Sequence, residues 1–310
     1  MNGQSGCLLL LAVLFVPACR TSPHDRSDTP NPRFDSGQPV GPVTAIVCEG
    51  DWLASCSQSG VRIDESLVAL EFRPVDLALT SSGVLVGGGK PGRTGEVTVL
   101  TRAGEVMAHR QVSEDLVYKV AVSPDGHSAA AGCADGTLVI LKLPSLELVR
   151  RLSPHTAPVR ALQFSADGTR LTSGGLDGLV CSLVLASEEI VVFAAHTSGV
   201  ESLRLVDGVV YSGSVDGKVR VHTRSRLIRS YLGLGYPVVD LLPVQGKMLA
   251  LLSSGDVVEL LVDSDQVLVQ HRFGTEVFAL AACPYKDGSV EFLAGLSGKL
   301  VKATASLVAF

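Results

Sequence analysis

The chain has 310 residues, a formal net charge of −5, and 46% hydrophobic, 18% charged and 5% aromatic residues. This composition excludes a disordered chain and a polytopic membrane protein. The negative net charge gives no sign of the basic surface that nucleic-acid binding requires. The 32 glycines and scarce aromatics favour a fold rich in tight turns over one with a bulky aromatic core.

The N-terminus begins with a short apolar run, CLLLLAVLFV, over residues 7–16. Ten helical residues rise about 15 Å, about half of the roughly 30 Å hydrocarbon layer, so the run predicts a signal peptide over residues 1–18. The segment Val16-Pro17-Ala18-Cys19 resembles the bacterial lipobox, whose Cys is acylated and becomes the new N-terminus. We therefore expect a lipid on Cys19; a cleaved soluble export signal and a fortuitous apolar run are the alternatives.

Residues 19–42 contain five prolines and few aliphatic side chains. Such a segment cannot bury enough apolar surface to offset its ordering entropy, so it predicts a disordered tether behind the lipidated cysteine. Together the two segments predict a location at the bacterial envelope, on the outer membrane or the periplasmic side of a membrane. The alternative is a secreted or soluble periplasmic protein.

From residue 43 to the end, short apolar segments alternate with turns at a regular period. One glycine before the third strand of each unit sets the register, at intervals of 35 to 43 residues. These glycines are Gly60, Gly95, Gly136, Gly178, Gly217, Gly255 and Gly298. An aspartate precedes three of them, and Asp-Gly supplies the positive φ of a tight hairpin. In the third unit we expect strands at approximately 116–122, 128–133, 137–141 and 147–152.

These seven repeats, each with room for four short strands, predict an all-β fold. The paired phrases Ser123-Pro124-Asp125-Gly126 and Ser165-Ala166-Asp167-Gly168, with the Asp-Gly turns, resemble the WD-repeat family of β-propellers over residues 43–310. The resemblance implies a seven-bladed β-propeller with four-stranded antiparallel blades, six or eight blades being possible. In such a ring the segment Ser306–Phe310 is expected to complete the last blade, which leaves closure to packing of the first and last units.

The resemblance implies a hydrogen-bonded set in each blade: a His in the loop before it, a Ser or Thr on its second strand, an Asp in the next turn and a Trp on its third strand. His155, Ser173 and Asp177 match the first three positions, as do His196, Ser212 and Asp216 in the next blade. Leu183 and His222 stand at the Trp positions. A hydrolase triad needs an exposed nucleophile, and these serines are expected on buried strands, so the sets are interpreted as structural.

The loop around Lys90 and Arg93 is glycine-rich but fails the phosphate-loop spacing and leads into a strand. We interpret it as a hairpin loop, and the resemblance to WD repeats implies that it lies on the rim that carries the loops entering each blade. Both cations are therefore candidate partner contacts; a solvated loop is the alternative.

Basic residues alternate along the next candidate surface: Lys218, Arg220, His222, Arg224 and Arg226. On a strand, the early members share a face. Lys218, Arg220, Arg224 and Arg226 are candidate contacts to an acidic partner or lipid headgroups, against the simpler interpretation of a solvated blade edge.

The cysteines offer no metal or disulfide pattern. Without Cys7 and Cys19, the odd set Cys48, Cys56, Cys133, Cys181 and Cys283 remains, with no C-x-x-C motif, although a single bridge stays open. Asparagine occurs only at Asn2 and Asn31, so the propeller lacks the Asn ligands of lactonase-type metal sites. We expect no cofactor and no metal site.

The sequence thus favours a non-catalytic protein-interaction scaffold on the bacterial envelope, with other proteins as partners, membrane contact through the lipid alone, and no nucleic acid. The alternatives are a propeller enzyme of hydrolase or lyase type with its site at the central channel, and a surface module that binds glycans or peptides.

Overall fold

The computed structural model describes residues 42–49, 52–223, 226–244, 246–261, 266–272, 279–284, 290–296 and 299–303. Every regular element within these ranges is a β-strand, and they contain no helix that could span a membrane. The signal peptide, Cys19, the tether up to Gly41, Arg224 and the predicted last strand Ser306–Phe310 lie outside the described residues.

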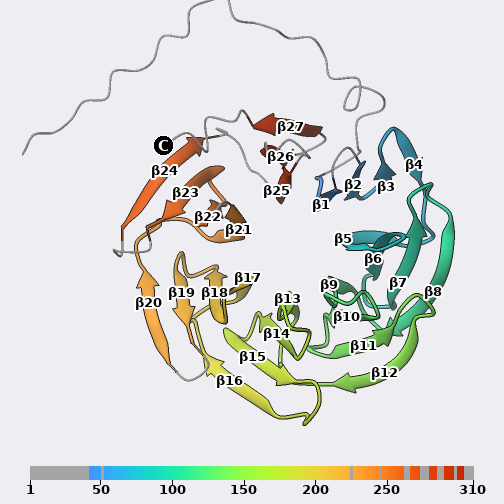
Figure 1. Cartoon of the computed structure of the whole chain (residues 1–310), viewed down its shortest axis with the longest axis horizontal. Helices are drawn as coiled ribbons and strands as arrows, with labels where there is room; N and C mark the ends of the chain where they lie inside the picture. The colour runs from blue at the N-terminus through green and yellow to red at the C-terminus, as the bar shows by residue number, and fades with distance from the viewer. Residues whose placement is uncertain are drawn as a thin grey trace, which may run out of the picture.

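Six sheets have four antiparallel strands each, and in each the strands follow chain order from the centre of the ring to its circumference (Figure 1). The first three are β1 (Ala45–Glu49), β2 (Trp52–Ser57), β3 (Gly60–Ile63) and β4 (Ser66–Val68); β5 (Arg73–Thr80), β6 (Gly83–Lys90), β7 (Thr94–Thr101) and β8 (Val106–Ser113); and β9 (Val117–Val122), β10 (Ser128–Cys133), β11 (Leu138–Lys142) and β12 (Glu147–Leu152). The next three are β13 (Val159–Phe164), β14 (Arg170–Gly175), β15 (Leu179–Val184) and β16 (Ile190–Ala194); β17 (Val200–Val206), β18 (Val209–Ser214), β19 (Val219–His222) and β20 (Leu227–Tyr231); and β21 (Val238–Val244), β22 (Lys247–Leu252), β23 (Asp256–Leu260) and β24 (Val267–Arg272).

The C-terminal strands form a smaller sheet. β25 (Ala279–Pro284), β26 (Val290–Leu296) and β27 (Lys299–Ala303) pair in antiparallel order as a three-stranded sheet. Its innermost strand β25 lies against β21 on one side and β1 on the other. The three-stranded sheet therefore stands between the sixth blade and the first and completes the ring seen in Figure 1.

The prediction of seven four-stranded blades is wrong. The described residues form six four-stranded blades, the lower count that the sequence left open, and a three-stranded sheet. The count relied on one glycine before the third strand of each unit, and Gly298 supplies that marker in the last unit whether or not a fourth strand follows. Within the regular repeats the prediction was close, since the third blade has its four strands within about one residue of the expected bounds.

The Asp-Gly turns have the predicted backbone conformation. Gly136 adopts a φ of 83°, a region that L side chains rarely enter. The amide of Cys133 donates to the carbonyl of Thr137 at 2.9 Å, which closes the hairpin. The Asp135 carboxylate accepts from the Thr137 amide at 3.0 Å, and this explains the aspartate before the glycine.

Glycines on the second strands mark where adjacent blades meet. A Cβ on Gly174 would lie 2.6 Å from the Cγ1 of Val200, which begins the innermost strand of the next blade. The same contact recurs around the ring, so blades pack closely because one side of each contact has no side chain. The pairs are Gly87 with Val117, Gly132 with Val159, Gly174 with Val200, and Gly213 with Val238.

The ring closes through the same kind of contact. Gly295 on β26 faces Val43, just before β1, and a Cβ at Gly295 would lie 3.0 Å from the Val43 side chain. Ala281 of β25 also packs in one cluster with Leu53, Ile46 and Cys48 of the first blade. The first and last sheets therefore meet by face packing.

Candidate functional site: the mouth of the central channel

The structure brings His155, Ser173 and Asp177 together. The Nδ1 of His155 lies 3.1 Å from both carboxylate oxygens of Asp177, and its Nε2 lies 2.8 Å from Ser173 Oγ. A neutral ring in this network donates from Nδ1 to the carboxylate and accepts the serine hydroxyl at Nε2. Asp177 also accepts from the amides of Thr156 and Leu179, at 3.0 and 3.1 Å. The set thus ties the loop before the fourth blade to a hairpin within it.

His196, Ser212 and Asp216 repeat this geometry one blade later, with 2.8 Å from Nε2 to Ser212 Oγ and 3.1 Å from Nδ1 to the nearer Asp216 oxygen. Burial is the largest influence on His196 and its pKa is lowered, although the Asp216 carboxylate acts in the opposite direction. Burial opposes ionisation of Asp216, but His196 and hydrogen bonds outweigh this and hold its pKa below the usual range. Ser173 and Ser212 are both 0% exposed, so neither hydroxyl can reach a substrate.

Lys90 and Arg93 are exposed at the hairpin between β6 and β7. The amide of Gly92 donates to the Asp115 carboxylate at 2.8 Å, which holds the hairpin against the loop that enters the third blade. Neither cation forms an ion pair with a residue that the structure describes.

The basic stripe is interrupted in the structure. Lys218 and Arg220 are half-buried, Arg226 is exposed, and Arg224 lies outside the described residues. His222 is 4% exposed and its ring centroid lies 5.9 Å from that of Phe193. The alternating cations therefore do not share one solvated face.

The cysteines fall into two groups. Burial raises the pKa of the Cys56 and Cys181 thiols to about 12 and that of Cys133 to about 11, so these free cysteines are poor nucleophiles. Cys48 is disulfide-bonded. Within the residues that the structure describes, no group of three His, Cys, Asp or Glu side chains could hold a metal ion.

The sequence favoured binding at the rim loops and the mouth of the central channel, but the residues that line this mouth were not predicted. Five innermost strands carry a β-bulge near their first residue, at β5, β9, β13, β17 and β21. Side chains on a regular strand alternate between faces, but here the bulged residue and the next one both line the same cavity. The bulged residues are Val75, Tyr118, Arg160, Glu201 and Val239, and those after them are Asp76, Lys119, Ala161, Ser202 and Asp240.

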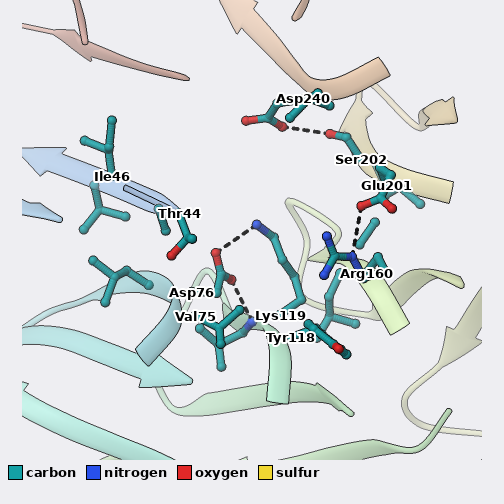
Figure 2. Close-up of a pocket in the computed structure, with 18 of the residues that line it drawn as sticks. Thr44, Ile46, Val75, Asp76, Tyr118, Lys119, Arg160, Glu201, Ser202 and Asp240 are labelled. Carbon is teal, nitrogen blue, oxygen red and sulfur yellow. Dashed lines mark hydrogen bonds and ion pairs between the residues drawn. The ribbon is translucent and has the colours of Figure 1, made fainter. Parts of the chain in front are cut away.

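Three ion pairs cross blade boundaries at this mouth, and Figure 2 shows two of them, Lys119 with Asp76 and Arg160 with Glu201. They are Lys119 Nζ with Asp76 Oδ1 at 2.9 Å, Arg160 Nε with Glu201 Oε2 at 2.9 Å, and Arg204 with Asp240 Oδ1 at 2.8 Å. The Arg160 guanidinium also lies 4.7 Å from the centre of the Tyr118 ring. These contacts form a continuous belt from the second blade to the sixth.

Hydrogen bonds anchor the carboxylates of the belt. Asp76 accepts from the Val120 amide at 2.9 Å, and Ser202 Oγ donates to Asp240 at 2.8 Å while accepting from the Leu241 amide at 3.0 Å. Both carboxylates are therefore held by donors of the neighbouring blade, and neither is a free general base.

The cavity at the mouth has a volume of about 730 Å3, within the range of small-ligand sites. Among its lining residues are four cations (Arg73, Lys119, Arg160, Arg204) and three carboxylates (Asp76, Glu201, Asp240), an excess of one positive charge in a chain of net charge −5. Arg73 is exposed and forms no ion pair within the described ranges.

Exposed apolar side chains lie on two hairpins next to the starts of β13 and β17 and on the loop that leads into β21, on the face of the ring that carries the mouth. Leu176 is 39% exposed, and its amide donates to Pro158, two residues before Arg160. Val215 is 41% exposed, and its amide donates to Gly199, two residues before Glu201. Leu232 and Tyr236, 61% and 51% exposed, lie in the loop that enters the sixth blade. We call Leu176, Val215, Leu232 and Tyr236 the apolar flank.

Aligning the repeats against one another could have found the mouth. The starts of four innermost strands read VYKV, VRAL, VESL and VVDL, with two variable residues between apolar ones. The variable pair is the bulged residue and its successor, and its frequent charge is the signal. The residue before Asp-Gly in two turns, Leu176 and Val215, marks the flank in the same way.

The comparisons with known proteins agree with this architecture. The family model described as WD domain, G-beta repeat matches residues 103–141, 146–181 and 187–223. WD40 repeats are therefore found over these three ranges, and that part of the prediction is confirmed.

Similar proteins include the Periodic tryptophan protein 2 homolog of Caenorhabditis elegans, 28% identical over 67% of this chain and 22% of that relative's length. The chain thus spans about a fifth of that relative.

Solved structures share the fold. A chain from the crystal structure of the mitotic checkpoint complex superposes with a TM-score of 0.70 at 15% identity, covering 87% of this chain and 90% of that one. The computationally designed Ika8 protein superposes with a TM-score of 0.68 at 22% identity, covering 84% and 82%.

Proposed function

We propose that this chain is a non-catalytic protein-interaction platform, held at the bacterial cell envelope by a lipid on Cys19, and that the face around the channel mouth is its contact surface. WD40 propellers typically act as protein-interaction scaffolds, and one similar chain comes from a multi-protein checkpoint complex. The lipobox-like segment before Cys19 and the disulfide at Cys48 support an exported location, because disulfides persist in oxidising compartments.

One observation supports the face around the channel mouth as the contact surface. At the channel mouth, charged side chains on rigid strands stand beside an exposed apolar flank. The three carboxylates there are already engaged in ion pairs, an arrangement that suits binding better than proton transfer.

Fractionation tests the anchor. A tagged full-length protein is expected in the membrane fraction, and Cys19→Ala is expected in the soluble fraction, since the lipid is lost. Retention of Cys19→Ala in the membrane fraction would contradict the anchor.

Site-specific crosslinking tests the platform. A photo-crosslinking residue at Leu176, beside the mouth, is expected to give a defined protein adduct in cells. The same residue at Val192, 52% exposed on the outermost strand β16, is the control and is expected to give none. Absence of a specific adduct from position 176 would contradict the platform.

A further inference from the structure

We infer that the channel mouth recognises an acidic peptide segment of its partner, with a carboxylate held by Arg160, Lys119 and Arg73 and neighbouring apolar side chains held by the apolar flank. This inference rests on the proposed function and specifies the chemistry of the contact.

Several N–H groups at the mouth donate no hydrogen bond to a described residue and are available to a ligand. Arg160 engages Glu201 through Nε, which leaves the two terminal nitrogens of its guanidinium facing the cavity without a hydrogen-bond partner among the described residues. Those nitrogens are the pair that binds a carboxylate through two parallel hydrogen bonds. Lys119 uses one of its three N–H groups for Asp76, and Arg73 has no ion pair within the described part of the chain.

The cations are arranged to hold a ligand. The Lys119 ammonium and the Arg160 guanidinium both extend into the cavity, each beside its own carboxylate (Figure 2). Their side chains are 33% and 35% exposed, so they are reachable yet restrained. Because the ion pairs fix both side chains before binding, little further side-chain conformational entropy is lost when they bind a ligand carboxylate.

The apolar flank adds a second requirement for the ligand, namely apolar side chains next to its carboxylate. Backbone hydrogen bonds place Leu176 and Val215 at the starts of β13 and β17, beside Arg160 and Glu201. An extended segment with a carboxylate in the mouth would therefore lay its adjacent side chains across these residues and bury them only if they are apolar.

Short synthetic peptides provide the probe: one alternates Glu and Leu, a second alternates Lys and Leu, and a third alternates Glu and Ser. Fluorescence anisotropy with the folded full-length protein is expected to show saturable binding of the Glu-Leu peptide. We expect at least about tenfold weaker binding of the other two, and weaker binding of the first as salt is raised.

A matched pair of double variants tests whether the peptide binds at the channel mouth. Arg160→Gln with Glu201→Gln removes one ion pair at the mouth without net charge change and is expected to weaken Glu-Leu binding by about tenfold. Arg150→Gln with Glu188→Gln removes the equivalent pair at the circumference, where Arg150 is 27% exposed, and is expected to leave binding unchanged. Leu176→Ser and Val192→Ser form the corresponding pair for the apolar flank. Melting temperatures confirm that each variant is folded.

Each outcome is decisive for the inference. It is overturned if the Glu-Leu peptide shows no saturable binding up to about 1 mM, if the Lys-Leu peptide binds as tightly, or if both double variants behave alike. The crosslinking at Leu176 reports separately, so an adduct that survives Arg160→Gln with Glu201→Gln would retain the platform and reject the acidic segment.

Discussion

At the scale of single residues, His222 stands apart because one of its ring nitrogens is buried without a hydrogen-bond partner among the described residues. Its Nε2 forms no hydrogen bond with any described residue, although the side chain is enclosed beside Phe193. Burial, with smaller contributions from His196 and Arg220, lowers the pKa of His222 to about 4. The ring is therefore neutral in the folded protein at pH values where an unfolded histidine is charged.

This predicts a stability that falls with acidity. Below a pH of about 6.5 the unfolded chain binds a proton at His222 that the folded chain does not, so the free energy of unfolding decreases by up to about 1.4 kcal/mol per pH unit down to a pH near 4. Leu183 occupies the equivalent position in the preceding blade, so His222→Leu is a natural replacement. This variant is expected to remove the contribution of His222 to the pH dependence of the free energy of unfolding. Urea unfolding at pH 5 and pH 7.5 measures it, and an equal effect of the variant at both pH values would contradict the prediction.

At the scale of elements, the contact between second-strand glycines and first-strand valines decides how blades pack. Gly174 on β14 and Val200 on β17 form one such contact, deep between the fourth and fifth blades. β14 is buried on both faces and Val200 is itself 0% exposed, so neither residue can move aside easily.

Gly174→Ala is therefore expected to destabilise the protein by about 1 to 3 kcal/mol, since the new methyl would overlap Val200. Adding Val200→Ala is expected to recover part of the loss, because it vacates the space that the methyl needs. Denaturant unfolding of the two single variants and the double variant gives the coupling energy. Additive losses would show that the two side chains do not compete for this space.

At the scale of the whole molecule, closure of the ring depends on the first blade and the three-stranded sheet. Face packing between Val43 and Gly295 joins them, and Cys48 packs in the cluster that contains Ala281 of β25. Cys48 is also disulfide-bonded, while Cys56, Cys133 and Cys181 are free. The cysteine bonded to Cys48 is therefore one of the three that remain in the sequence, Cys7, Cys19 and Cys283. If the chain is cleaved before Cys19 and Cys19 is acylated, only Cys283 is left.

Cys48→Ser is accordingly expected to lower the stability of the oxidised protein by about 2 to 4 kcal/mol and to have little effect under reducing conditions. Thermal unfolding with and without reductant measures the difference, and peptide mapping of the unreduced protein identifies the bonded cysteine. A variant as stable as the wild type under oxidising conditions would show that closure does not depend on this bond.

The local features were predictable because each depends on residues within one or two adjacent repeats. Asp135-Gly136 specifies its turn through a backbone angle and one side-chain bond, and the spacing of His155, Ser173 and Asp177 is a property of the repeat itself. The number of four-stranded sheets was not predictable, since the marker glycines do not report whether a fourth strand pairs.

The sequence by itself determined the repeated unit, its strands and turns and the resemblance to WD repeats, because these are periodic and local. Only the tertiary structure decided the channel mouth, the closure of the ring and the burial of His222. Residues such as Asp76 and Lys119, or Arg160 and Glu201, lie about one repeat apart in the chain. They meet because successive blades wind around a common axis and a bulge in each innermost strand directs them to the same cavity.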